Sequence, residues 1–334
     1  PMRRQIAGQR FERVQREVTL DVLAAAADVR RAWVDAVAAE ETLRYMRQVR
    51  EAAEAGAELA RRMEQVGNFN RLMRAREQGF YAEAALGLAR AEAAQRATRE
   101  RLVRALGLWG PQTAALRLPE RLPDLPAAPL EAPDIERQAI AQRLDVLAAR
   151  LAAEQTAREL GLTRTTRFVE ALELELSRNS SNDGPTARGW ELGFELPLFD
   201  RGDARVARAE HLTLQTLHQA ARTAIDARSE VREAYGAYRS AWDIARHQRD
   251  EIVPLAQRVS EEQLLRYNGM FIGVFDLLAD ARAQIAAVMG AIATLREFWL
   301  AQVELDMALV GRPHLAAAVA LPLPSAAPAA ADPH

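Results

Sequence analysis

Four glutamates that alternate with large apolar residues are the most distinctive polar groups of this sequence. Glu173 and Glu175 lie in one short stretch, and Glu191 and Glu195 lie in a second stretch that follows closely. A row of carboxylates on one face can attract cations, although solvation by water alone would also gather acidic residues on one side. The pattern therefore indicates a charged surface, carried by elements that have two different faces.

The five histidines do not form a metal or catalytic pattern. His211 and His218 are seven residues apart and can share a helix face, but no third ligand follows at a useful spacing. His247 is solitary, and His314 and His334 lie at or within the C-terminal tail. The sequence also lacks a Gly-rich phosphate loop, an H-E-x-x-H motif and a nucleophile elbow. We therefore expect a protein that is not an enzyme and that needs no metal or cofactor.

The composition excludes further classes of protein. The chain has 334 residues and no cysteine, so disulfides and thiolate metal sites are impossible. All 44 basic residues are arginine, and with 46 acidic residues the formal net charge is −2, which argues against a general nucleic-acid binder. No apolar run reaches the roughly 18 residues of a membrane-spanning helix. The N-terminus is not a signal peptide, and its Pro1-Met2 start suggests a mature or truncated fragment.

Helical periodicity dominates the rest of the chain. A very long helix is predicted over about 10–66 and ends at Gly67-Asn68, and a second helix over 71–106 is stopped by Gly107. The proline-rich residues 108–134 are predicted to form an irregular or extended connector that is not a core element. A short helix over 135–161 follows. Another long helix over 204–267 is expected to kink at Pro254, and a last helix covers 274–310.

These elements give a mainly α-helical chain with six units. They are a first long helical hairpin (1–107), the connector (108–134), the short helix (135–161), a transmembrane β-hairpin (162–202), a second long helical hairpin (203–312) and a disordered tail (313–334). The two helical hairpins are expected to form coiled coils, because apolar and small residues recur at spacings of three and four.

The two helical hairpins are related by an internal duplication. The segment from Asp28 to Trp33 matches the segment from Glu230 to Tyr235 at an offset of 202 residues. Gly67 matches Gly269 at the same offset, and both are predicted to break their helices by adopting unusual backbone angles. If the duplication is complete, a leading helix and a first β-hairpin should precede residue 1.

The alternating stretches predict a β-hairpin with one apolar and one acidic face. An isolated hairpin is marginal in water, so its apolar face must be buried either on a helix layer or in lipid around a closed barrel. Because two or four strands cannot close a barrel with a lumen, several chains would have to contribute. The long helices could continue such a barrel as a tube, which favours the membrane alternative. In it, Glu173, Glu175, Glu191 and Glu195 line the lumen, Glu170 lies at the water interface, and the lipid-facing residues are Leu172, Leu174, Leu176, Trp190, Leu192, Phe194 and Leu196.

Four further motifs are the strand exit from Trp190 to Gly202, the helical turns 63–72 and 265–278, and the helix start at 142–147. In these motifs the chain resembles the TolC family of outer-membrane efflux proteins. The resemblance covers roughly 1–312, without the N-terminal third of the family pattern.

The resemblance implies a homotrimer with a 12-stranded barrel in outer-membrane lipid and a periplasmic helical tunnel. Such a passive duct docks on a periplasmic adaptor, which links it to an inner-membrane transporter. The docking tips carried over by position are Val66, Gly67, Asn68, Phe69, Leu72, Asn268, Gly269, Met270, Phe271, Gly273, Val274 and Phe275. The gate candidates are Arg266, Tyr267, Asp276 and Asp280, with Arg71 and Arg74 as possible partners. The alternative is a soluble periplasmic coiled-coil scaffold or adaptor.

Overall fold

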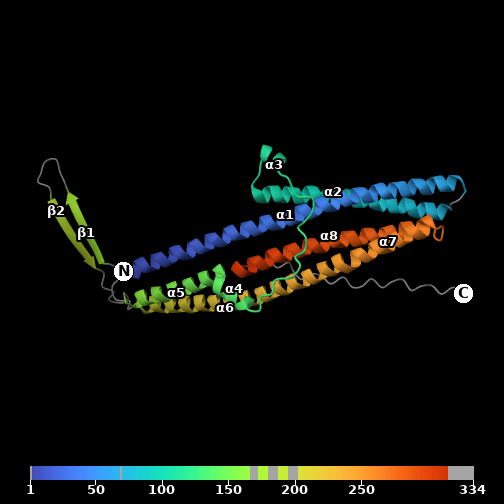
Figure 1. Ribbon diagram of the computed structural model, residues 1–334. Coiled ribbons are helices and arrows are strands. Elements are labelled where there is room, and N and C mark those ends of the chain that lie inside the picture. The colour runs from blue at the N-terminus through green and yellow to red at the C-terminus, as the bar shows by residue number, and fades with distance from the viewer. Residues whose placement is uncertain (1, 68–69, 166–171, 180–186, 195–201, 315–334) are drawn as a thin grey trace.

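The computed structural model describes residues 2–67, 70–165, 172–179, 187–194 and 202–314, and within these ranges most residues are helical. Among the described residues, no helix is long and apolar enough to cross a membrane. The elements, in chain order, are α1 (Met2–Gln65), α2 (Arg71–Leu106), α3 (Pro111–Ala115), α4 (Ile135–Gln142), α5 (Leu144–Thr165), β1 (Leu172–Asn179), β2 (Ala187–Phe194), α6 (Asp203–His247), a π-helical turn (Gln248–Ile252), α7 (Val253–Asn268) and α8 (Val274–Val310) (Figure 1).

The two helices of the first predicted hairpin are present, although α1 begins at Met2 rather than near residue 10. The 64-residue α1 ends beside Gly67, and α2 begins after Asn70, whose side chain accepts a hydrogen bond from the Met73 N–H at 2.9 Å. This contact satisfies one of the free donors of the helix N-terminus. At the other end of α2, Gly107 has φ 66, and its backbone N–H donates to carbonyls of the last turn, as expected of a left-handed helix cap.

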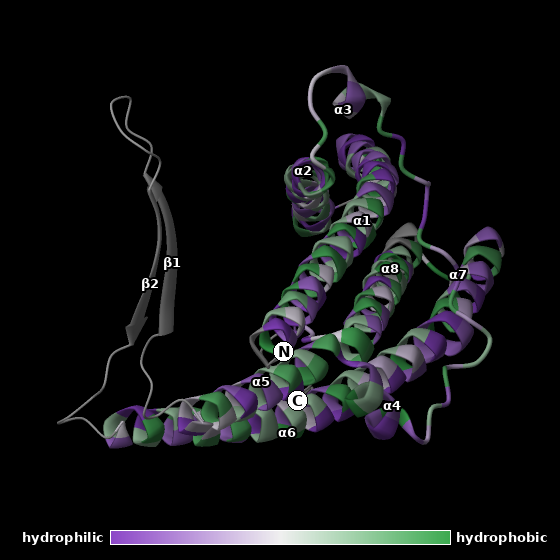
Figure 2. Ribbon diagram, turned by 90° about the vertical axis from the view of Figure 1, so that its left-hand side faces the viewer, coloured by the Kyte–Doolittle hydropathy of each residue, from purple (hydrophilic) through white to green (hydrophobic). Residues whose placement is uncertain are grey.

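The second hairpin packs beside the first in a curved layer. In the half that contains the turns, the helices follow the order α2–α1–α8–α7 (Figure 2), and each neighbouring pair is in contact. In the other half, α5 lies between α1 and α6 and contacts both. Helices of more than 30 residues gain most of their stability from such lateral packing rather than from intrinsic propensity.

The predicted helix over 135–161 is wrong in one respect, because it is two helices. Arg143 separates α4 from α5 with φ −61 and ψ 122, an extended conformation. Its guanidinium is fully buried and contacts Asp145 and Glu230 at 2.7 Å each. The break allows one side chain to join the α4–α5 corner to α6, which periodicity alone could not indicate.

The interruption of the second long helix also differs from the prediction. A π-helical turn over Gln248–Ile252 precedes Pro254, and the Val253 N–H donates to the Gln248 carbonyl five residues back. Proline lacks an N–H and collides with the carbonyl four residues before it. The π-turn widens the backbone at this point, so that the rod continues as α7.

The prediction that the connector is not a core element is wrong. We call its residues 116–134 the strap, because they run across the helical layer between α3 and α4 (Figure 1). Leu122 and Leu125 of the strap are buried among the helices. The indole N–H groups of Trp242 and Trp299 donate to strap carbonyls at 3.0 Å each, and the Tyr238 hydroxyl accepts from a strap N–H at 2.9 Å. The aromatic side chains thus satisfy an extended backbone that has no ladder of its own.

The main core lies beneath the strap. Tyr238 of α6 and Phe298 of α8 are buried with their ring centroids 5.5 Å apart, and Trp242 and Leu305 belong to the same cluster. Burial of such side chains contributes about 1.5–3 kcal/mol each. This core joins the strap to α6 and α8 of the second hairpin, and a second cluster of Leu122 with Val34 and Val37 joins the strap to α1. The outer helix α7, in contrast, contains no buried residue.

The predicted β-hairpin is present as one antiparallel pair. Its register pairs Leu172 with Phe194, Leu174 with Leu192 and Leu176 with Trp190. Glu175 pairs with Glu191 in the same ladder. Directly paired residues share one face of an antiparallel sheet. The backbone register therefore joins the two predicted apolar sets to each other.

Candidate functional site

The candidate site of the first helical hairpin is its tip, where α1 turns into α2. Gly67 has φ 78, as predicted, and its N–H donates to the Glu64 carbonyl at 3.0 Å. Val66 and Leu72 expose most of their apolar side chains at this tip. Asn68 and Phe69 lie outside the described residues. The tip combines these apolar residues with exposed arginines, including Arg71.

The tip of the second hairpin is more apolar. Met270 and Phe271 are 93% and 84% exposed, and Leu265 beside them is also exposed. Asn268, Gly269 and Gly273 are exposed as well. The side chains of Val274, Phe275, Asp276 and Asp280 lie outside the described part. Exposed large apolar groups at a helix turn form a contact surface that water solvates poorly.

The prediction that Gly269 needs an unusual backbone angle is wrong. Gly269 has φ −79, whereas its neighbour Met270 has φ 62 and occupies the left-handed region. The absence of a side chain at Gly269 matters for the position of Phe271, because a Cβ atom on Gly269 would lie 2.8 Å from two carbons of the Phe271 ring. The missing side chain of Gly269 therefore makes room for Phe271.

The described gate candidates have partners that the sequence did not indicate. Arg74 forms an ion pair with Glu64 across the first turn. Arg266 and Tyr267 are exposed beside the second turn, and their backbone carbonyls accept hydrogen bonds from Phe271 and Met270 at 2.9 Å each. The described residues thus bring Arg266 and Tyr267 together at one tip and place Arg74 at the other.

A tie between the two helical hairpins lies farther from the tips. Arg282 of α8 reaches the Glu77 carboxylate of α2 at 3.0 Å, and its guanidinium lies 4.2 Å from the centre of the Phe80 ring. Glu77 is only 4% exposed. A buried carboxylate needs a compensating cation, so this pair holds α8 against α2. Sequence reasoning missed it because the two residues are 205 positions apart.

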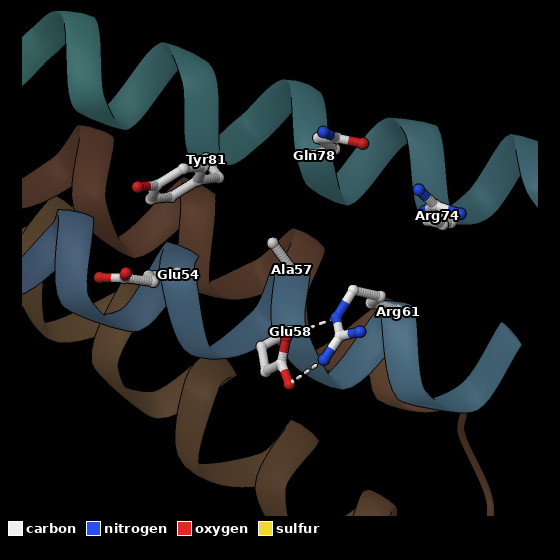
Figure 3. Close-up of a pocket in the computed structure, with 7 residues that line it drawn as sticks. All are labelled: Glu54, Ala57, Glu58, Arg61, Arg74, Gln78 and Tyr81. Carbon is white, nitrogen blue, oxygen red and sulfur yellow. Dashed lines mark hydrogen bonds and ion pairs between the residues drawn. The ribbon is translucent and has the colours of Figure 1, made fainter. Parts of the chain in front are cut away.

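A groove between α1 and α2 lies near the tip of the first hairpin (Figure 3). It has a volume of about 240 Å³ and is lined by both helices, including Glu54, Arg74 and Tyr81. Glu58 accepts two 2.8 Å hydrogen bonds from Arg61. Hydrogen bonds from Arg61 and Arg62 lower the pKa of Glu58 to about 2, so this exposed carboxylate stays ionised. The groove is charged and open rather than apolar and enclosed, which suits contact with a protein surface better than binding of a small apolar ligand.

The β-hairpin is described by its backbone alone. The register places Glu173 opposite Gly193 and brings Glu175 and Glu191 together, which agrees with one acidic face. Glu170, Glu195 and Leu196 lie outside the described residues. The lipid-facing and lumen-facing roles of this hairpin stay predictions.

A titratable contact fixes the strap to α1. Burial raises the pKa of Glu41, although the Leu122 backbone hydrogen bond and the nearby Arg44 and Arg121 lower it. The other Glu41 oxygen, Oε2, is buried with no hydrogen-bond partner. Sequence reasoning had no signal for this contact, because it depends on the path of the strap.

We expect Glu41→Gln to raise the stability of the helical layer at neutral pH. Because the folded-state pKa of Glu41 is raised, its protonated form favours folding below the unfolded-state pKa, and this contribution is lost as the pH rises through the folded pKa. Thermal unfolding of both proteins from pH 7 down to pH ~4.5 checks this. The advantage of the variant should shrink as the pH falls, and an advantage that stays constant would contradict the role of Glu41.

Comparison with descriptions of known protein families finds no match, and comparison with curated proteins also finds none. Solved structures, in contrast, share the fold. A membrane protein from Pseudomonas aeruginosa matches with a TM-score of 0.80 and 21% identity, over 92% of this chain and 70% of that chain. The open state of the MtrE outer-membrane channel of Neisseria gonorrhoeae matches with a TM-score of 0.76 and 19% identity, over 92% of this chain and 70% of that chain.

The CmeC outer-membrane channel of Campylobacter jejuni matches with a TM-score of 0.74 and 17% identity, over 91% of this chain and 66% of that chain. The chain thus spans about two thirds of the length of these channel structures. The duplicated helical hairpins, the strap and the β-hairpin together form a fold that these solved outer-membrane channel structures share.

Proposed function

We propose that this protein is the outer-membrane channel component of a tripartite efflux system, a passive homotrimeric duct without enzymatic activity. The observation that carries the proposal is the agreement of more than nine tenths of the chain with solved outer-membrane channels. The curved helical layer supports it, because a layer with two free edges can be closed into a tube by further copies. Its outer helices expose apolar residues at those edges, among them Leu86 of α2 and Leu255 and Val259 of α7.

In this proposal the β-hairpin contributes to a trimeric barrel in outer-membrane lipid. The register supports this, because Leu174 pairs with Leu192 and Leu176 pairs with Trp190 at alternate positions, while Glu175 and Glu191 occupy the position between them. Alternation of apolar and polar residues is the pattern of membrane barrels, with apolar residues toward lipid and polar residues toward the lumen. The acidic positions would then favour passage of cations.

The two tips would dock on a periplasmic adaptor, which links the duct to an inner-membrane transporter. The exposure of Val66, Leu72, Met270 and Phe271 supports this role, because apolar side chains at a turn gain free energy when a partner covers them. The proposed gate consists of Arg266, Tyr267, Asp276 and Asp280. The Glu77–Arg282 pair supports a closed arrangement of the two hairpins near the same end.

Membrane fractionation and planar bilayer recording test the proposed duct. The full-length protein is expected in the outer-membrane fraction, to require detergent for extraction, and to give single-channel currents that select for cations. Recovery only in soluble form without detergent would overturn the proposal and favour the soluble scaffold. Detergent-extracted protein that never conducts would overturn the duct while keeping the membrane location.

A further inference from the structure

The π-helical turn at Gln248–Ile252 changes the alignment of the two repeats. On its N-terminal side, the buried residues Leu43 and Ala245 correspond at an offset of 202 residues, as do the buried residues Ala36 and Tyr238. On its C-terminal side, the buried Ala53 corresponds to the half-buried Ala256 at an offset of 203. A π-turn accommodates one additional residue within a helix, and this one-residue shift is its expected result.

The backbone of the tips confirms the offset of 203. The Gly67 N–H donates to the Glu64 carbonyl at 3.0 Å, and the Met270 N–H donates to the Tyr267 carbonyl at 2.9 Å. Gly67 and Met270 are each the second residue after the last residue of their helix, and each has a positive φ. The residue equivalent to Gly67 in the structure is therefore Met270, and not Gly269 as the sequences align.

The shift has a chemical consequence at the apex of the second tip. The left-handed position of the first tip is occupied by a glycine, which offers no side chain. The same position of the second tip carries Met270, and Gly269 moves one place back, where it makes room for the Phe271 ring. Methionine in this conformation is strained relative to glycine, and its side chain extends almost wholly into solvent.

We propose that the π-turn sets the register that presents Met270 and Phe271 at the second tip, and that these two side chains determine which tip a partner recognises. The partner surface would have an apolar pocket, since both side chains are apolar and exposed. This inference rests on the proposed function for the identity of the partner, a periplasmic adaptor, whereas the register itself is independent of that function.

Gln248 secures the register against α8. Its Nε2 donates to the Ala287 carbonyl at 2.8 Å, and a Cβ atom on Gly290 would lie 2.8 Å from the same nitrogen. On the N-terminal side of the π-turn, α6 is held by the strap, because Trp242 donates to the Pro126 carbonyl. Both contacts lie at or before the first residue of the π-turn, so they fix the register of the helix at the point where the shift begins.

Three glycine and methionine variants test the register by thermal unfolding of the full chain. Gly67→Ala should lower the unfolding midpoint by roughly 2 °C, because alanine is strained at a positive φ. Met270→Gly should raise the midpoint, and Gly269→Ala should leave it nearly unchanged, since the exposed Phe271 ring can move. If Gly269→Ala lowers the midpoint as much as Gly67→Ala, or Met270→Gly lowers it, the register is wrong.

A deletion variant tests the role of the π-turn. Removal of the exposed Glu251 together with Pro254→Ala should take out the one additional residue, restore a continuous α-helix and leave Met270 in the left-handed position. In that background Met270→Gly should still raise the midpoint, and loss of this gain would overturn the proposal. If the deletion variant does not fold, the three single variants still decide the register.

Docking is measured by the binding of a purified periplasmic adaptor protein encoded in the same genome. Met270→Gly and Gly269→Ala should each weaken binding by about tenfold or more, because each alters one of the two apex side chains. Arg137→Met, at an exposed position outside both tips, should bind as the unaltered chain does. Equal binding by all variants would overturn the specificity role. Failure of the unaltered chain to bind any such adaptor would instead count against the proposed function.

Discussion

Replacement of Arg143 by methionine is expected to lower the free energy of unfolding by about 3–5 kcal/mol. The Arg143 guanidinium is 1% exposed and donates to the Asp145 and Glu230 carboxylates at 2.7 Å each. It also donates to the Ala308 carbonyl at 3.4 Å. Methionine fills a similar volume but leaves two carboxylates largely buried without their shared cation. Urea unfolding followed by helical circular dichroism measures the change.

The matched control is the exposed ion pair between Arg137 of α4 and Asp134, the residue that precedes this helix. Its charged atoms are 3.1 Å apart, and both side chains are well exposed. Arg137→Met should therefore change the free energy of unfolding by less than about 1 kcal/mol. A similar, small loss in both variants would mean that Arg143 does not hold the α4–α5 corner to α6.

Replacement of Arg282 by methionine is expected to have two effects. It leaves the buried Glu77 carboxylate without its cation, which should cost about 2–4 kcal/mol of folding stability, discounted because the Arg282 side chain is 36% exposed. It also removes the tie between α2 and α8. In bilayer recordings of the proposed duct, we therefore expect a larger conductance or a longer open time, because the two hairpins can separate more easily.

The double variant Glu77→Met with Arg282→Met distinguishes these two effects. Its stability should recover, since replacing a buried ion pair by apolar residues is often neutral or stabilising. Its conductance should stay raised, because the charged tie is still missing. Glu58→Gln, which alters an exposed pair on the same hairpin, serves as the control for charge alone. Conductance that follows stability back to its original value would show that the pair acts only through folding.

The sequence by itself determined the helical hairpins, their turns and the β-hairpin. These features depend on local chemistry, namely apolar residues at helical spacing, Gly67 and Gly107 at helix ends, and strict alternation between Leu172 and Leu176. Such signals involve residues within one or two turns of each other. They also indicated the duplication, because the two copies of the pattern can be compared directly.

Only the tertiary structure decided the path of the strap, since its Leu122 and Leu125 become core residues by packing against distant helices. The same holds for the ion pairs of Arg143 with Glu230 and of Arg282 with Glu77, because the partners lie far apart along the chain. Periodicity indicates which face of a helix or strand is apolar, but it does not indicate which residues that face packs against.

The second tip shows most directly what the sequence alone could not predict. The sequence aligns Gly269 with Gly67, whereas the structure gives the left-handed position to Met270. The reason is that a one-residue shift at the π-turn, more than a dozen residues away, changes the backbone register of the whole segment that follows.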